Sequence, residues 1–175
     1  MNAYQKEYER LAAKDSFRAE TWMGERKRLV EKYSWAIPSD AVLSYIAERG
    51  PLQELGAGSG YWTHELRKQG TRVSAIDIDP PENTWSRVVE GDESLLDSRP
   101  LLLVWPPVNE SMGHDALRAH ESAGGSDVFY VGEWCGCTAD KQFHRVLEAN
   151  YEFVRSMDIP SYNHIHDNFY HYRKV

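Results

Sequence analysis

The sequence lacks the marks of a membrane-spanning or secreted protein. No apolar run among its 175 residues approaches the length of a membrane span, and its first ten residues, MNAYQKEYER, are too polar for a signal peptide. Only two cysteines are present, Cys135 and Cys137, which are too few and too close together for a disulfide framework. We therefore expect a cytoplasmic protein without a membrane partner.

A convincing metal-binding pattern is also missing. Cys135-x-Cys137 and His164-x-His166 together offer four side chains, the number that a structural zinc needs. However, C-x-C is a poorer spacing than C-x-x-C, and cysteines of cytosolic proteins are usually free thiols. We therefore expect no metal.

The chain has no excess of positive charge. Its net charge is −7, and residues 1–33 carry eight Lys and Arg against six Asp and Glu, so the remainder carries −7 − 2 = −9. An acidic body is a poor electrostatic match for a phosphate backbone. This disfavours a nucleic-acid partner, although the stretch ERKRLVEK (residues 25–32) keeps one open.

Internal repeats and low-complexity segments are absent, and the chain alternates between strand and helix patterns. From residue 35 onward, short apolar runs separated by helical segments indicate an α/β sandwich with a mostly parallel sheet. We predict strands over 52–55, 72–77, 86–91, 100–105, 127–132, 151–160 and 168–175, and helices from Asp40 and over 61–69, 113–123 and 139–149. The last two strands are joined by too short a connection for a right-handed crossover, so we expect an antiparallel pair there.

Residues 1–34 are predicted to form a helical extension or lid on the domain 35–175, the two making one compact unit. A break near Lys14–Ser16 should divide the helical pattern in two. The residues that share a helical face are Tyr4, Tyr8 and Leu11 in the first part and Trp22, Leu29, Val30 and Tyr33 in the second.

The stretch QELGAGSGYW (residues 53–62) carries the most specific signal in the sequence. Its glycines, Gly56, Gly58 and Gly60, are spaced G-x-G-x-G, whereas the dinucleotide fingerprint is G-x-G-x-x-G. Tyr61 occupies the position of the third fingerprint glycine, and Glu54 would repel a phosphate. No G-K-[ST] follows, so a Walker loop is excluded. The loop therefore favours a ligand without phosphate.

The pattern E-x-G-x-G-x-G resembles motif I of the class I S-adenosylmethionine-dependent methyltransferases, and the likeness extends over residues 35–175. It implies a Rossmann-like three-layer sandwich whose seven-stranded sheet is mostly parallel, with an antiparallel C-terminal strand. It also implies S-adenosylmethionine as the cofactor. That molecule carries a sulfonium and an ammonium group, which carboxylates near the loop would favour, and glycines let the backbone approach it closely.

The same resemblance assigns cofactor-binding residues along the chain. Asp77, with Asp79 as the competing candidate, would accept hydrogen bonds from the ribose hydroxyls, and Asp92 would meet the adenine amino group. The expected cofactor-binding residues are Glu54, Gly56, Gly58, Gly60, Tyr61, Asp77, Asp92, Trp105 and Pro106.

The motif that should contact the methyl acceptor departs from the resemblance. Amine-directed relatives carry [DNS]-P-P-[YFW], where this chain has Trp105-Pro106-Pro107-Val108. Trp105 cannot accept a hydrogen bond as a carboxylate does, and Val108 offers no ring to stack on a base. We therefore expect an unidentified, small-molecule acceptor. A methyltransferase acting on nucleic acid or protein, and a non-catalytic binding protein, stay open. Glu133 and His166 are the candidate catalytic bases.

Overall fold

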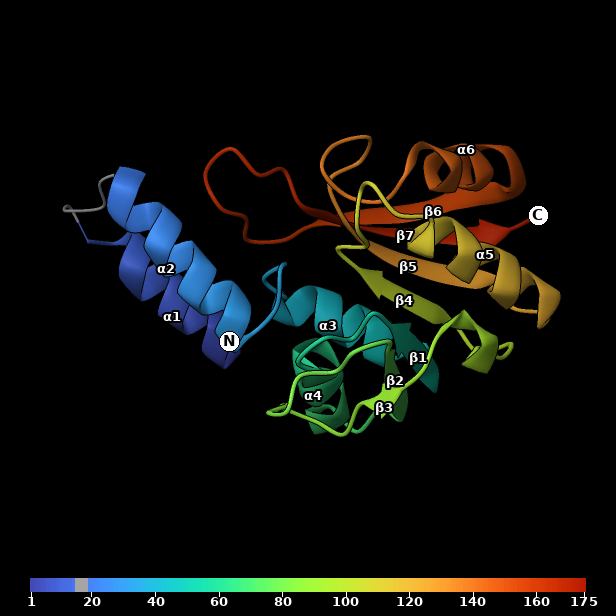
Figure 1. The fold of residues 1–175 in the computed structure, drawn as a ribbon, viewed down its shortest axis with the longest axis horizontal. Coiled ribbons are helices and arrows are strands. Elements are labelled where there is room, and N and C mark those ends of the chain that lie inside the picture. The colour runs from blue at the N-terminus through green and yellow to red at the C-terminus, as the bar shows by residue number, and fades with distance from the viewer. Residues whose placement is uncertain (15–18) are drawn as a thin grey trace.

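A single seven-stranded sheet forms the centre of the molecule, with strand order β3-β2-β1-β4-β5-β7-β6 (Figure 1). The computed structural model describes the backbone of residues 1–14 and 19–175, and the side chains of residues 1–14 and 23–175. The strands are β1 (Leu52–Leu55), β2 (Val73–Asp77), β3 (Val89–Glu90), β4 (Leu101–Val104), β5 (Asp127–Gly132), β6 (Tyr151–Asp158) and β7 (Asn168–Lys174).

The strand directions confirm the predicted sheet. Strands β3, β2, β1, β4 and β5 are parallel to one another, and β7 is antiparallel to both β5 and β6. The sheet is therefore mostly parallel with an antiparallel C-terminal strand, as expected. The chain reverses its direction across the sheet between β1 and β4, which places the topological switch point at the carboxyl ends of these two strands.

Helices cover both faces of the sheet (Figure 1). On one face lie α3 (Asp40–Ala47) and α4 (Tyr61–Lys68), whose buried Ile46 and Trp62 pack against Leu102 and Phe129 of the sheet. On the other face lie α5 (Met112–Ser122) and α6 (Lys141–Asn150), packed on residues such as Tyr130. The three-layer sandwich predicted from the sequence is thus confirmed.

The ends of the helices follow from local sequence. The hydroxyl of Ser39 accepts a hydrogen bond from the amide of Val42, so Ser39 is the N-cap of α3. The carboxylate of Asp140 caps α6 in the same way. The strand expected over 86–91 is limited to two exposed residues, Val89 and Glu90, because it pairs only with β2 at the edge of the sheet. A short 3₁₀ helix, η1 (Glu93–Leu95), follows it.

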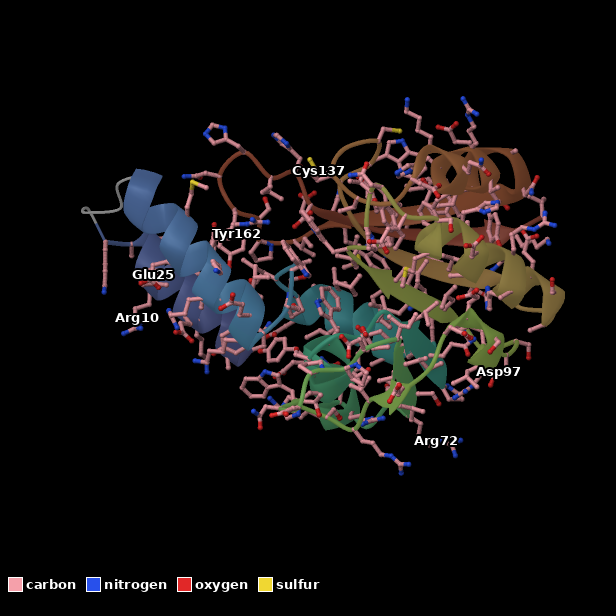
Figure 2. All side chains as sticks on the ribbon, in the orientation of Figure 1. Arg10, Glu25, Arg72, Asp97, Cys137 and Tyr162 are labelled. Carbon is pink, nitrogen blue, oxygen red and sulfur yellow. The ribbon has the colours of Figure 1, made fainter. Side chains whose placement is uncertain are left out.

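The N-terminal helices α1 (Ala3–Ala12) and α2 (Ala19–Lys32) lie beyond the carboxyl ends of the parallel strands (Figure 1). The expected break at Lys14–Ser16 and the packing of Trp22 fall partly or wholly outside the described residues. Tyr4, in the first turn of α1, is fully buried, and its hydroxyl forms a hydrogen bond with the hydroxyl of Tyr162 at 2.7 Å. Tyr162 lies against the helical pair in Figure 2.

Besides the two layers of apolar residues on the faces of the sheet, a further hydrophobic cluster joins the helical pair to the rest of the chain. Its buried members are Tyr4, Leu11, Leu29, Tyr33, Ile37, Tyr61 and Tyr162. The pair thus packs on the start of α4 and on the loop between β6 and β7. Its use as a lid stays a prediction. Among the described helices, none is both long and apolar enough to cross a membrane.

Candidate functional site

A cavity of about 640 Å³ opens at the switch point of the sheet. We call it the main cavity; it lies where the loop after β1 meets the loop after β4, the usual place for ligands in such sheets. Its lining residues are Trp35, Leu55, Gly56, Gly58, Asp77, Ile78, Gly91, Asp92, Glu93, Val104, Trp105, Pro106, Pro107, Glu110, Ser111, Met112 and Asp115. Predicted residues from four separate segments are therefore brought together.

The glycine loop adopts a backbone conformation that other residues rarely accept. Gly56, Gly58 and Gly60 have φ angles of 72°, 50° and 71°. A Cβ on Gly58 would meet no atom within 4 Å, and Gly58 lines the main cavity, so its missing side chain leaves open space there. Gly60 has a different use, because a Cβ there would lie 2.9 Å from the side chain of Val88. Gly58 is therefore the glycine whose missing side chain leaves room for a ligand in the main cavity.

The carboxylate of Asp77 is fixed at the end of β2 and borders the main cavity. One oxygen accepts a hydrogen bond from the amide of Gly58 at 2.7 Å, and the other accepts from the amide of Asp79 at 3.0 Å. Each carboxylate oxygen can accept more than one bond, so Asp77 retains capacity for a ligand. The competing candidate, Asp79, is exposed and does not line the main cavity.

Asp92 also lines the main cavity, close to the end of β3. Its carboxylate accepts a hydrogen bond from the amide of Ser94 at 2.9 Å and so caps η1. Hydrogen bonding from the Ser94 hydroxyl, and then from the Ser94 amide, holds the pKa of Asp92 below its ordinary value. Ile78, between Asp77 and the turn, is 77% exposed and lines the same cavity. An apolar side chain at a cavity rim can pack against a flat ring; sequence reasoning missed it.

The main cavity is acidic. Every charged residue in its lining is a carboxylate: Asp77, Asp92, Glu93, Glu110 and Asp115. Negatively charged walls attract cations and repel anions such as a pyrophosphate. This arrangement supports the prediction that the glycine loop holds a ligand without phosphate.

Glu54 lies behind the glycine loop and is only 2% exposed. Its carboxylate accepts a hydrogen bond from the hydroxyl of Thr63 at 2.5 Å, and Glu54 lines a smaller cavity of about 130 Å³ on the inner side of the loop. Burial raises the pKa of Glu54 to about 7, although the bond from Thr63 opposes this and the charge of Asp77 adds to it. A cation nearby would therefore favour the ionised form.

Glu54→Gln should change how stability depends on pH. Folding raises the pKa of this group from 4.5 to about 7, so the folded protein binds a proton that the unfolded chain has lost in that range. The stabilisation that protonated Glu54 contributes to the folded state is therefore lost as pH rises from 4.5 through about 7. Each pH unit in this window corresponds to about 1.4 kcal/mol, so the free energy of unfolding falls by about 3 kcal/mol in all. Relative to wild type, the variant should gain stability between pH 5 and pH 8.

Urea unfolding at pH 5 and pH 8 checks this expectation. The exposed Glu48, the C-cap residue of α3, provides Glu48→Gln as a control that removes one carboxylate without a buried environment. The control should differ from wild type by the same small amount at both pH values. An equal difference at both pH values for Glu54→Gln would contradict the argument.

Trp105 follows β4 in an unusual backbone conformation, with φ at 55°. Such residues persist only where their surroundings hold them, and they gather at functional sites. The Trp105 amide donates to the carbonyl of Val131 at 2.8 Å, and its ring stacks on that of Trp35 with centres 5.2 Å apart. Trp105 and Pro106 both line the main cavity, and their contact with a cofactor stays a prediction.

Asp167 is a buried carboxylate that sequence reasoning missed. It is 7% exposed and accepts a hydrogen bond from the indole nitrogen of Trp105 at 2.6 Å. Burial raises the pKa of Asp167 to about 6, with the bond from Trp105 acting in the opposite direction and the charge of Glu133 adding to the rise. The sequence indicates the neighbouring His166 as a candidate base and not Asp167, because only the fold brings Asp167 against Trp105.

Glu133 links two loops beside the site. Its carboxylate accepts from the amide of His166 at 2.7 Å and from the amide of Cys137 at 3.0 Å. Burial alone would raise the pKa of Glu133, but these amides outweigh it and hold the pKa below its ordinary value. Glu133 and His166 are absent from the lining of the main cavity, and the His166 side chain is 87% exposed. Their catalytic roles stay predictions.

Tyr61 occupies a different place from the one predicted. Its ring is fully buried and does not line the main cavity. The Tyr61 hydroxyl accepts from the amide of Tyr4 at 3.0 Å and donates to the side chain of Asn2 at 3.3 Å. The structure therefore uses Tyr61 to hold the N-terminal helix.

Potential metal ligands do not converge within the part of the chain that the structure describes. There, no three His, Cys, Asp or Glu side chains are arranged to hold a metal ion. Cys135 and Cys137 are both free and exposed.

Comparisons with known proteins support the fold. No family model matches the sequence, and no curated protein matches it as a sequence relative. Among solved structures, magnesium protoporphyrin IX methyltransferase from Synechocystis, with bound S-adenosylhomocysteine, superposes with a TM-score of 0.59 at 8% identity, over 98% of this chain and 94% of that one.

Two further structures are similar. The 1,6-didemethyltoxoflavin-N1-methyltransferase of Burkholderia thailandensis has a TM-score of 0.56 at 21% identity, covering 77% of this chain and 76% of its own. A glycopeptide N-methyltransferase has a TM-score of 0.52 at 12% identity, covering 80% of this chain and 92% of its own. At such identities the likeness shows the fold, and this fold is the one shared by these methyltransferases.

Proposed function

We propose that this chain, which has the fold of the class I S-adenosylmethionine-dependent methyltransferases, binds S-adenosylmethionine and transfers its methyl group to a small molecule. The observation that carries the proposal is the bond between Asp77 and Gly58 at the wall of an acidic cavity. It joins a carboxylate that can accept further hydrogen bonds to a glycine without a side chain, at the switch point of the sheet. A phosphate-free cation fits this combination.

The residues present suit the parts of this cofactor. Asp77 would accept hydrogen bonds from the ribose hydroxyls, with Ile78 and Asp92 beside the adenine. Gly56 and Gly58 would allow the backbone to approach the methionine portion, with Glu54 behind the loop as a counter-charge. These assignments follow from which residues line the two cavities and from their charges.

The cofactor supplies the reactive group, and the chain supplies position. A lone pair of the acceptor attacks the methyl carbon while the electron pair of the breaking C–S bond returns to sulfur, leaving S-adenosylhomocysteine. Alignment of the two molecules accounts for most of the help that such a displacement needs. Trp105 and Pro106, fixed at the end of β4, would form the wall beside the reacting atoms. A proton released by the acceptor would pass to solvent or to a nearby base.

A small-molecule acceptor is supported by the ion pairs of two basic residues of α2, Arg28 and Lys32. Arg28 forms ion pairs with Glu7 at 2.9 Å and with Glu25 at 2.9 Å, and Lys32 pairs with Glu7 at 2.7 Å. These cations are therefore partly neutralised within the helical pair and present little free charge to a phosphate backbone.

Calorimetry with S-adenosylmethionine and S-adenosylhomocysteine tests the proposal. Both should bind at micromolar concentration, whereas the phosphate-bearing NAD⁺ should give no heat, because five carboxylates face the site. No binding of either sulfur compound at high micromolar concentration would refute the proposed function. Binding without transfer of a labelled methyl group to any member of a broad acceptor panel would favour a non-catalytic protein of the same fold.

A further inference from the structure

A second large cavity borders helix α2. It has a volume of about 580 Å³, and we call it the α2 cavity. Its lining residues are Met23, Gly24, Arg26, Lys27, Val30, Glu31 and Trp35. Val30, Glu31 and Trp35 also line the small cavity behind the glycine loop, so the α2 cavity and that loop share walls. A molecule in the α2 cavity is therefore next to the proposed cofactor site.

Trp35 is the residue that connects the cavities. It lines the main cavity, the small cavity and the α2 cavity. Its ring stacks on Trp105 with an angle of 11° between the planes, yet Trp35 is still 51% exposed. A large aromatic ring that keeps half its surface free beside a cavity is suited to stack on another flat ring.

Arg26 is a cation without an ion pair among the described residues. Its Nε atom is buried and has no hydrogen-bond partner, whereas Arg28 on the same helix is paired with two carboxylates. The Arg26 guanidinium lies 5.4 Å from the ring centre of Tyr162, 5.6 Å from that of Trp35 and 5.8 Å from that of Trp105. Arg26 therefore sits among three aromatic rings, and Trp35 beside it keeps half of its surface exposed.

The charges of the two cavities differ in sign. The charged lining residues of the main cavity are all carboxylates, whereas those of the α2 cavity are Arg26, Lys27 and Glu31. Lys27 and Glu31 face each other at 3.8 Å, which leaves Arg26 as the cation available to a ligand. The nearby carboxylate of Asp167 is engaged by the indole of Trp105. The charged lining of the α2 cavity is therefore positive overall, in contrast to that of the main cavity.

We propose that the α2 cavity binds the methyl acceptor, and that this acceptor is a planar aromatic acid whose ring stacks on Trp35 and whose carboxylate pairs with Arg26. A guanidinium binds a carboxylate through two parallel hydrogen bonds, which gives orientation as well as affinity. The identity of the ligand as the acceptor rests on the proposed function; the binding of a planar acid does not. The cationic cofactor would then bind in the acidic main cavity, and the anionic acceptor would bind in the adjacent α2 cavity beside Arg26.

Three probes separate the effect of the aromatic ring from the effect of the charge. Indole-3-carboxylate is planar and anionic, indole-3-carboxamide is planar and neutral, and cyclohexanecarboxylate is anionic without an aromatic ring. Each is titrated into the full chain by calorimetry, with and without S-adenosylhomocysteine. Indole-3-carboxylate should bind at least tenfold more tightly than either of the others.

Variants of the cavity walls identify the site. Arg26→Gln should remove the preference for the carboxylate over the carboxamide, and Trp35→Leu should remove the preference for the aromatic acid over the alicyclic one. Arg28→Gln, a matched loss of charge on the same helix, should keep both preferences. Arg26→Gln should bind S-adenosylhomocysteine within threefold of wild type, which shows that it has folded.

The outcomes separate this inference from the proposed function. Equal affinity for the three probes, no binding of any of them, or a preference for the carboxylate that survives Arg26→Gln would overturn the inference. If the probes show the expected preferences while S-adenosylhomocysteine does not bind, the proposed function fails and the planar-acid site stands. If S-adenosylhomocysteine binds and the preferences are absent, only the acceptor site fails.

Discussion

Gly58→Ala should weaken the binding of S-adenosylmethionine at least 100-fold. Gly58 has φ at 50°, and a Cβ placed there would enter the open space of the main cavity. The new methyl group would lie where the backbone must approach the ligand, so the contact is lost even if the loop keeps its shape. Strain in the left-handed region adds roughly 1 kcal/mol to the cost of folding. Calorimetry gives the affinity.

Gly124→Ala is the matched control for this variant. Gly124 also has a positive φ, 83°, and a Cβ there would likewise meet no atom within 4 Å, but Gly124 follows α5 and does not line the main cavity. Both variants should lose a similar amount of thermal stability, and only Gly58→Ala should lose binding. Wild-type affinity in Gly58→Ala, or an equal loss of affinity in both variants, would show that the ligand does not approach the backbone at Gly58.

Asp77→Ala should have an effect of comparable size on the same ligand. Its carboxylate anchors the amide of Gly58 at 2.7 Å and faces the cavity, so the substitution removes both a loop contact and the expected acceptor for two ribose hydroxyls. Hydrogen bonds to a charged group contribute about 1.5–3 kcal/mol each, so two of them correspond to a loss of at least about 100-fold in affinity. Titration with S-adenosylhomocysteine measures it.

Asp79→Ala tests whether charge alone explains such a loss. Asp79 lies two residues further along the chain, is exposed, and does not line the main cavity. It removes the same charge from nearly the same place on the surface, and its affinity for the ligand should stay within threefold of wild type. A larger loss of affinity in Asp79→Ala than in Asp77→Ala would show that Asp79, and not Asp77, contacts the ribose.

The features that the sequence revealed are those set by local backbone demands. Gly56 and Gly58 lie at positive φ, and Asp77 ends a buried strand, so their spacing along the chain already reflects their places in the fold. The mostly parallel sheet followed from the alternation of apolar runs with helices. The antiparallel position of β7 followed from a connection too short to cross the sheet.

The features that the sequence did not reveal depend on contacts between distant segments. Trp35 stacks on Trp105, and Asp167 bonds Trp105, across separations of 70 and 62 residues along the chain. No periodic pattern records such pairs. Tyr61 shows the reverse case: it belongs to the quoted glycine stretch, yet the N-terminal helix covers its ring and turns it into a packing residue.

A crystal structure of the complex with S-adenosylhomocysteine tests the central claim most directly, namely that the glycine loop and Asp77 hold this ligand. The ribose hydroxyls should bond the carboxylate of Asp77, the adenine should lie beside Ile78 and Asp92, and the sulfur should face Trp105 and Pro106. A ligand bound outside the main cavity, or one whose ribose makes no contact with Asp77, would contradict the proposed cofactor site.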